Sequence, residues 1–304
     1  MKYIIVLIIL SFSFLKIEAQ QDTHYTGYMF NTLVVNPAYA GSLPVARAMV
    51  YYRHQWADIA EAPRDLSLSF HTPLKENVGL GLYVENDQIG VHNRLRVFAS
   101  YAYQLRTDFG DLALGIQAGG LNYSSSFTEV ENLIDNDDLI FAENRSRFLP
   151  NVGVGLFFYT NKTYIGFSVP HLLNNDILDE GISKLSPEAR HYFISGGTVL
   201  DLNKDIKLKP SAMVKLVPSE APFSLDLNLS FILKEQFVLG AAHRLSESIS
   251  GFLTYYFDSN LQLGYVYDYP LINLNGASGS HEVFVGYDFA GKNKGERIVS
   301  PRFF

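Results

Sequence analysis

Apolar residues recur at every second position along most of the chain. Between Phe223 and Leu233 every odd-numbered residue is phenylalanine or leucine, whereas most of the even-numbered residues are serine, aspartate or asparagine. Successive side chains of a β-strand point to opposite faces, so this pattern gives a strand with one apolar and one polar face. A helix would distribute the same residues around its axis. The alternation therefore predicts strands.

Fourteen segments of this kind can be counted, and no stretch after residue 19 is apolar enough for a transmembrane helix. Strands cross a membrane only as a closed barrel, and single-chain bacterial barrels have an even number of antiparallel strands. We therefore predict an all-β fold, a transmembrane antiparallel β-barrel of about fourteen strands over residues 46–290. The predicted strands are 46–56, 64–72, 77–86, 93–107, 111–123, 150–160, 163–170, 190–202, 206–217, 222–233, 236–245, 249–258, 261–269 and 281–290.

The lengths of the connections predict the orientation of this barrel. Outer-membrane barrels have tight periplasmic turns and longer extracellular loops. The longest connections, about 124–149, 171–189 and 270–280, all follow odd-numbered strands, whereas those after even-numbered strands, such as 161–162, are compact. This phasing places both chain ends in the periplasm.

The N-terminus has the layout of a secretory signal peptide. Lys2 precedes an apolar run from Ile4 to Leu15, which is too short to span a bilayer, and the small residue Ala19 follows. We expect a signal peptide at 1–19, a periplasmic or lumenal segment at 20–45 that packs on or in the lumen, and a periplasmic tail at 291–304. No cysteine is present to carry a lipid or a disulfide.

Composition narrows the class of protein further. Of the 304 residues, 47% are hydrophobic and 14% aromatic, with 19 Tyr and 22 Phe, which suits strands better than helices. The formal net charge is -7 and basic clusters are absent. These features argue against nucleic-acid binding.

Catalytic and metal-binding motifs are absent as well. The run from Gly276 to Ser280 does not fit the G-x-S-x-G elbow of hydrolases, and His281 with Glu282 lacks the second histidine of a zinc protease, because position 285 is Val285. The glycine pairs in 79–81 and 153–155 lie inside alternating strands, where glycine makes room for bulky neighbours or curvature. We predict no catalytic residue, no metal site and no cofactor.

Charged residues of both signs fall on the inward face by the strand alternation. They could form ion pairs that fill the lumen, or they could line a water-filled pore. We favour pairing, because the lumen of fourteen strands is wide and the segment 22–42 could fold back against it. The predicted lumen-facing polar cluster is Arg53, Glu85, Lys215, Asp226, Arg244, Asp268 and Glu282, with Arg47, Arg94, Arg96, Arg106 and Asp288 on the same face.

The predicted extracellular loop 124–149 combines carboxylates with apolar residues. A charge run is usually a solvated face, but embedded apolar side chains need burial, so the loop is expected to cap the barrel mouth or to dock a partner. Its acidic residues lack the glycine and terminal glutamate of a calcium-binding loop. The candidate partner-binding residues are Glu131, Leu133, Ile134, Asp137, Asp138, Ile140 and Phe141.

Longer motifs make the chain recognisable. It resembles the PorP/SprF family of type IX secretion membrane proteins in QDTHYTGYMFN at 21–31, NPAYAGS at 36–42, YRHQW at 52–56, GSHE at 279–282 and SPRFF at 300–304. The resemblance extends over nearly the whole mature chain. Two mild departures are Thr32, where the family commonly has proline, and Phe303, commonly tyrosine.

The resemblance implies a non-enzymatic barrel that works with the type IX secretion apparatus, a system associated with gliding motility. The implied partners are outer-membrane lipid, components of the secretion machine, and the C-terminal domain of a secreted protein such as a surface adhesin. A passive porin or hydrophobic-solute channel is the alternative that the architecture alone allows. An outer-membrane enzyme ranks last.

Overall fold

A computed structural model describes residues 26–126, 145–179, 182–218, 221–257, 260–271 and 278–289. The expected signal peptide, the tail 291–304 and most of the acidic loop lie outside these residues. The described strands are β1 (Ala46–His54), β2 (Arg64–Lys75), β3 (Val78–Ile89), β4 (His92–Thr107), β5 (Gly110–Ser125), β6 (Arg145–Tyr159), β7 (Thr163–Val169), β8 (Asn175–Asp179), β9 (Ile182–Glu188), β10 (Tyr192–Thr198), β11 (Leu200–Asp201), β12 (Ile206–Val217), β13 (Ala221–Leu233), β14 (Phe237–Arg244), β15 (Ser248–Phe257), β16 (Leu261–Pro270) and β17 (Ser280–Phe289).

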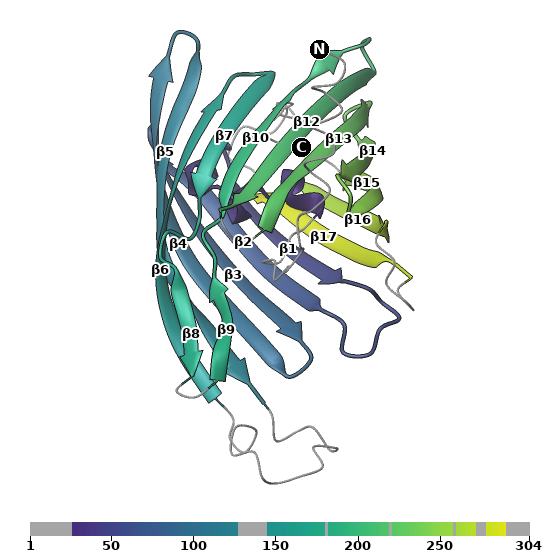
Figure 1. Ribbon diagram of the computed structural model, residues 1–304. Helices are drawn as coiled ribbons and strands as arrows, with labels where there is room; N and C mark the ends of the chain where they lie inside the picture. Colours follow the sequence, from purple (N-terminus) through teal and green to yellow (C-terminus); the bar gives the residue numbers. More distant parts are fainter. Residues whose placement is uncertain are drawn as a thin grey trace, which may run out of the picture.

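The strands close into an antiparallel barrel (Figure 1). β1 pairs with β17 on one side and with β2 on the other, and β10 joins β7 to β12. The short β11 pairs with β12 as β10 does, so it continues the same barrel strand past Val199. The prediction of fourteen antiparallel strands is thereby confirmed.

The alternation of the sequence becomes the two faces of the wall. On β13, Leu227, Leu229 and Phe231 are exposed, whereas Asn228 and Ser230 are buried. The apolar side chains thus cover the outer surface of the barrel and the polar ones face inward, as a wall between lipid and a polar interior requires.

All of the long connections join strand ends at one end of the barrel. They are 55–63, 126–144, 170–191 and 271–279, whereas no connection at the other end is longer than 202–205. We call these the long-loop end and the short-turn end. β2 continues to Lys75, so the turn expected at 73–76 is reduced to 76–77.

Part of a predicted loop is a hairpin. Within 171–189, β8 and β9 pair with each other as a separate two-stranded sheet. The sequence of these strands has no period-two alternation of apolar residues, which is why the pattern did not reveal them. Leu172 donates its backbone N–H to the carbonyl of Val152 at 2.8 Å, so the chain after β7 still follows β6.

The segment before β1 lies inside the barrel (Figure 1). It forms three 3₁₀-helices, η2 (Thr26–Phe30), η3 (Thr32–Val34) and η4 (Pro37–Tyr39). Of the two placements predicted for this segment, the structure therefore has the lumenal one for 26–42, which we call the lumenal segment. In the described part of the chain, no helix is long and apolar enough to cross a membrane.

Candidate functional site

The lumenal segment packs against two different parts of the barrel wall. Phe30 belongs to an apolar cluster with residues of β1 and of β12 to β17, including Phe252 and Phe284. Leu33 and Tyr39 belong to a second cluster, with residues of β4 to β7 such as Phe157. The segment therefore bridges the interior from one wall to the other.

Glycines in the wall allow this close approach. A Cβ atom placed on Gly115 of β5 would lie 2.1 Å from the backbone nitrogen of Ala38, and one on Gly79 of β3 would lie 2.1 Å from the carbonyl oxygen of Ala40. Real Cβ atoms do not approach other atoms so closely, so these positions accept only glycine unless the segment moves. At Gly79, the room that the sequence predicted is occupied by the lumenal segment.

Hydrogen bonds fix the segment along its length. The Asn36 amide donates to the carbonyl oxygen of Leu156 at 3.0 Å, and the Gln104 amide donates to the carbonyl oxygen of Gly41 at 2.7 Å. The Ser168 hydroxyl donates to the carbonyl oxygen of Val35 at 2.6 Å. The carbonyl groups of Val35 and Gly41 are thus satisfied by side chains of the wall.

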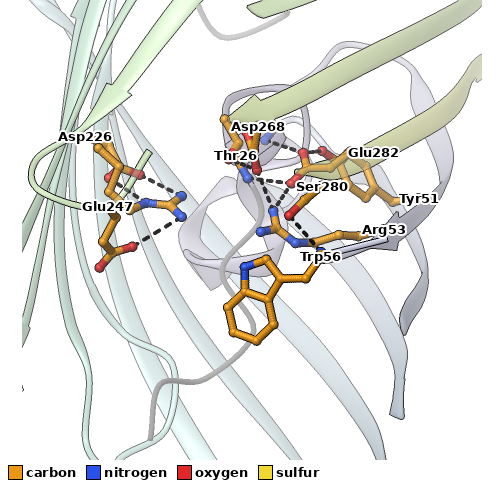
Figure 2. Close-up of polar contacts among 11 residues, drawn as sticks. Thr26, Tyr51, Arg53, Trp56, Asp226, Glu247, Asp268, Ser280 and Glu282 are labelled. Atoms are coloured by element: carbon orange, nitrogen blue, oxygen red, sulfur yellow. Dashed lines mark hydrogen bonds and ion pairs between the residues drawn. The ribbon is translucent and has the colours of Figure 1, made fainter. Parts of the chain in front are cut away.

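The start of the segment is held by a buried charge cluster near the long-loop end (Figure 2). Glu282 accepts the backbone N–H groups of Thr26 and Gly27 at 2.9 and 3.0 Å, and also binds Tyr51 and Arg53. Asp268 accepts the Thr26 hydroxyl at 2.8 Å and Arg53 at 3.1 Å. Glu282 is fully buried, so its charge depends on these donors. We call Arg53, Asp268 and Glu282 with Tyr51 and Thr26 the latch.

The structure distributes the predicted polar cluster over several groups. Arg53, Asp268 and Glu282 meet in the latch. Arg244 forms a two-point contact with Asp226 at 3.0 and 3.3 Å, and its second partner is Glu247 at 3.6 Å. Arg96 pairs with Glu85 at 3.1 Å. Lys215 is buried on β12 and faces Ser224 in the strand register.

Of the other charges predicted to face inward, Arg47 and Arg94 also lie next to carboxylates inside the barrel, but Arg106 does not. Arg47 pairs with Asp288 near the short-turn end, and Arg94 lies 3.9 Å from Asp87. Arg106 was expected to face the lumen, but its side chain is 61% exposed and lies 3.9 Å from Glu76. It stands next to the last residue of β4, where the wall ends and the inward direction leads into solvent.

Several polar residues in the barrel interior were not among those predicted from the sequence. Tyr51 is two residues before Arg53 on β1, and Asp65 is buried opposite Arg53 on β2. The period-two alternation would have found both, because they fall on the inward positions of their strands. Thr26 carried no such signal, since it precedes every strand.

The loop candidates Glu131, Leu133, Ile134, Asp137, Asp138, Ile140 and Phe141 lie outside the described residues. Among the residues that are described, no three histidine, aspartate or glutamate side chains gather as a set of metal ligands.

Comparison with solved structures supports the fold. The crystal structure of the toluene transporter TbuX of Ralstonia pickettii matches with a TM-score of 0.55 and 12% identity, covering 85% of this chain and 93% of that one. The outer membrane protein Omp33 of Acinetobacter baumannii matches with a TM-score of 0.48 and 8% identity, over 81% of this chain and 98% of that one. At such identities the TbuX match shows the barrel fold alone.

Comparison with protein families is more specific. Among curated proteins no match was found. The model of the family described as type IX secretion system membrane protein PorP/SprF matches residues 17–287, which include the lumenal segment and almost the whole barrel. The chain is thus an outer-membrane barrel that belongs to the PorP/SprF family of type IX secretion system membrane proteins.

Proposed function

We propose that this barrel binds or retains a secreted protein, such as a surface adhesin, at the outer face of the outer membrane, and that it does so in association with the secretion machine. Family membership supports the association with type IX secretion. The secreted protein would be recognised through its C-terminal domain. No enzymatic step is part of this proposal.

The lumenal segment is the observation that carries the proposal. A passive porin needs an aqueous path along its axis, whereas residues 26–42 fill the interior between β1, β12 to β17 and β4 to β7. Leu33, Ala38 and Ala40 of this segment are at most 1% exposed, which leaves little water around them. This packing favours a barrel that acts through its outer surfaces over one that acts as a pore.

The long-loop end offers the surface that such a partner would contact. The connections 126–144 and 170–191 are the longest of the chain, and the hairpin of β8 and β9 belongs to the second of them. A standard protein interface buries about 800 Å² on each partner, which long loops can supply and two-residue turns cannot. We therefore place the partner at the long-loop end.

A gene deletion tests this function first. Deletion should remove a specific surface protein from the cells, through loss into the medium or degradation, while nutrient uptake stays normal. A chromosomal variant that replaces 127–144 by a short turn should show the same loss. The matched control, replacement of the short turn 202–205 by another turn of equal length, should retain the protein.

Affinity purification of the tagged barrel from crosslinked cells then identifies the partner. Recovery of a secreted protein's C-terminal domain or of secretion-machine subunits would support the proposal. Their reproducible absence, together with clear single-channel conductance, would move the protein to the alternative class of passive porins or hydrophobic-solute channels.

A further inference from the structure

The outer face of the barrel changes from apolar to basic near the long-loop end of β16, β17, β1 and β2. These strands are neighbours in the sheet (Figure 1). One outward row across them contains Tyr265, Val283, Tyr52 and Leu66. Two residues closer to the long-loop end of each strand, the next outward row contains Tyr267, His281, His54 and Arg64. We call His281, His54 and Arg64 the basic row.

The first of these rows belongs to the lipid-facing surface. Its four side chains are between 41% and 52% exposed, like other apolar residues of the outer wall. Tyrosines such as Tyr52 and Tyr265 mark the level of the membrane–water interface on outer-membrane barrels. Two residues of a strand span about 7 Å, so the basic row is one step beyond this level. At that height lipid headgroups, rather than acyl chains, border the wall.

The basic row presents several hydrogen-bond donors side by side. Arg64 is exposed, and His54 and His281 are half-buried. In the strand register His54 stands directly opposite His281 on β17 and directly opposite Arg64 on β2. Side chains in such positions start about 4.5–5.5 Å apart, so the three can contact one ligand. Guanidinium and imidazole N–H groups both donate to phosphate oxygens, and arginine does so with two parallel hydrogen bonds.

Tyrosines of the neighbouring strand position one of the histidines. The Tyr265 hydroxyl lies 2.7 Å from Nδ1 of His281, and the ring of Tyr267 lies 5.2 Å from the imidazole ring. When the tyrosine donates this hydrogen bond, the imidazole proton is on Nε2. A residue of the interfacial row thereby directs the N–H of His281 towards a ligand.

The charges of the wall select an anion at this place. The outward positions of β16, β17, β1, β2 and β3 carry no aspartate or glutamate, and carboxylates of these strands such as Asp65 and Glu282 are buried on the inward face. A metal ion on the two histidines would be repelled by Arg64. A soluble protein at the long-loop end approaches the loops, whereas the basic row is on the side of the barrel that borders the membrane. The ligand that fits is therefore an anionic group of a lipid.

We propose that His281, His54 and Arg64 bind the phosphate of an anionic lipid headgroup, and that an acyl chain of the same lipid lies along Tyr52 and Leu66. With the long-loop end outside the cell, this is a phosphorylated lipid of the outer leaflet. The inference is independent of the proposed function. Such a contact would hold the seam between β1 and β17 at a fixed depth in the membrane.

Binding of lipid A, a phosphorylated outer-leaflet glycolipid, to the purified protein in detergent tests this site. Native mass spectrometry should detect the lipid on the parent protein, and the thermal midpoint should rise when lipid A is added. Arg64→Gln and the double variant His54→Gln/His281→Gln should each weaken binding about tenfold or more, because each removes charge-assisted or N–H donors to the phosphate. Arg106→Gln is the matched control, since it removes an exposed arginine at the short-turn end and should bind like the parent protein.

Two further ligands identify what the basic row recognises. Lipid A without its phosphate groups should bind the parent protein no better than lipid A binds Arg64→Gln, and inorganic phosphate alone should leave the thermal midpoint unchanged. The proposal fails if both variants bind lipid A like the parent protein while keeping a β-rich circular dichroism spectrum, or if the phosphate-free lipid binds equally well. A rise of the midpoint in inorganic phosphate as large as that in lipid A would contradict the lipid and assign the row to a free anion.

Discussion

Glu282 binds the backbone of Thr26: its carboxylate accepts the Thr26 N–H at 2.9 Å, although the two residues are 256 positions apart in the sequence. Glu282 lies on β17, the strand that closes the barrel against β1. The contact therefore ties the first described residue to the seam between the first and the last strand. The strand that closes the barrel therefore also holds the start of the lumenal segment.

The latch should contribute strongly to stability because its charges are buried. Arg53→Met removes the cation between Asp268 and Glu282 and leaves both carboxylates without it. Loss of one partner from a buried ion pair typically costs about 3–5 kcal/mol. The measurement is thermal unfolding of the purified protein in detergent by circular dichroism.

Arg106→Met is the control for this variant, because Arg106 is exposed at the short-turn end and should change stability by less than about 1 kcal/mol. Arg244→Met, which breaks the pair with Asp226, should resemble Arg53→Met. If both buried variants melt like the parent protein, water reaches these charges and the channel alternative gains support.

The contact between Gly115 of the barrel wall and the lumenal segment gives a second prediction. Gly115→Val should displace the segment or destabilise the barrel, since even the first added carbon would lie 2.1 Å from the Ala38 nitrogen. Overpacking of an interior costs about 1–3 kcal/mol or more. Gly251→Val is the matched control on β15, because a Cβ atom there meets nothing within 4 Å. Equal heat stability of the two variants, judged by gel migration with and without boiling, would refute this packing.

Orientation in the membrane can be measured with single cysteines, because the chain has none of its own. Asp58→Cys, at the long-loop end, should react with a membrane-impermeant maleimide on intact cells. Asn203→Cys, in an exposed turn at the opposite end, should react only after the outer membrane is opened. The reverse pattern would invert the proposed orientation.

The strands could be predicted because a lipid-facing wall imposes a local rule on every second residue. The rule also placed Arg53, Asp226 and Glu282 on inward positions, and it failed for Arg106 only because the strand ends there. No local sequence pattern predicts the path of residues 26–42. Its hydrogen-bond partners, such as Leu156 and Gln104, are distant in sequence. The reason for a glycine at position 115 becomes clear only from the structure, where the segment lies against it.

Trp56 illustrates a second limit of sequence reasoning. The motif at 52–56 was visible as part of a family resemblance, but the left-handed backbone of Trp56 can be seen only in the structure. For the acidic loop the reverse holds. Its composition made it a candidate site in the sequence, but its candidate residues lie outside the described part of the chain.

The lumenal segment fills the interior of the barrel, and we propose that the protein acts through its outer surfaces. Conductance of the purified protein in planar lipid bilayers tests this most directly. A variant in which residues 26–42 are replaced by a flexible glycine-serine linker of equal length provides the open reference, provided that it keeps a β-rich circular dichroism spectrum. We expect the variant to show discrete conductance steps and the parent protein to show none. Steps of equal size in both proteins would mean that the lumenal segment does not seal the barrel, and the proposal would be wrong.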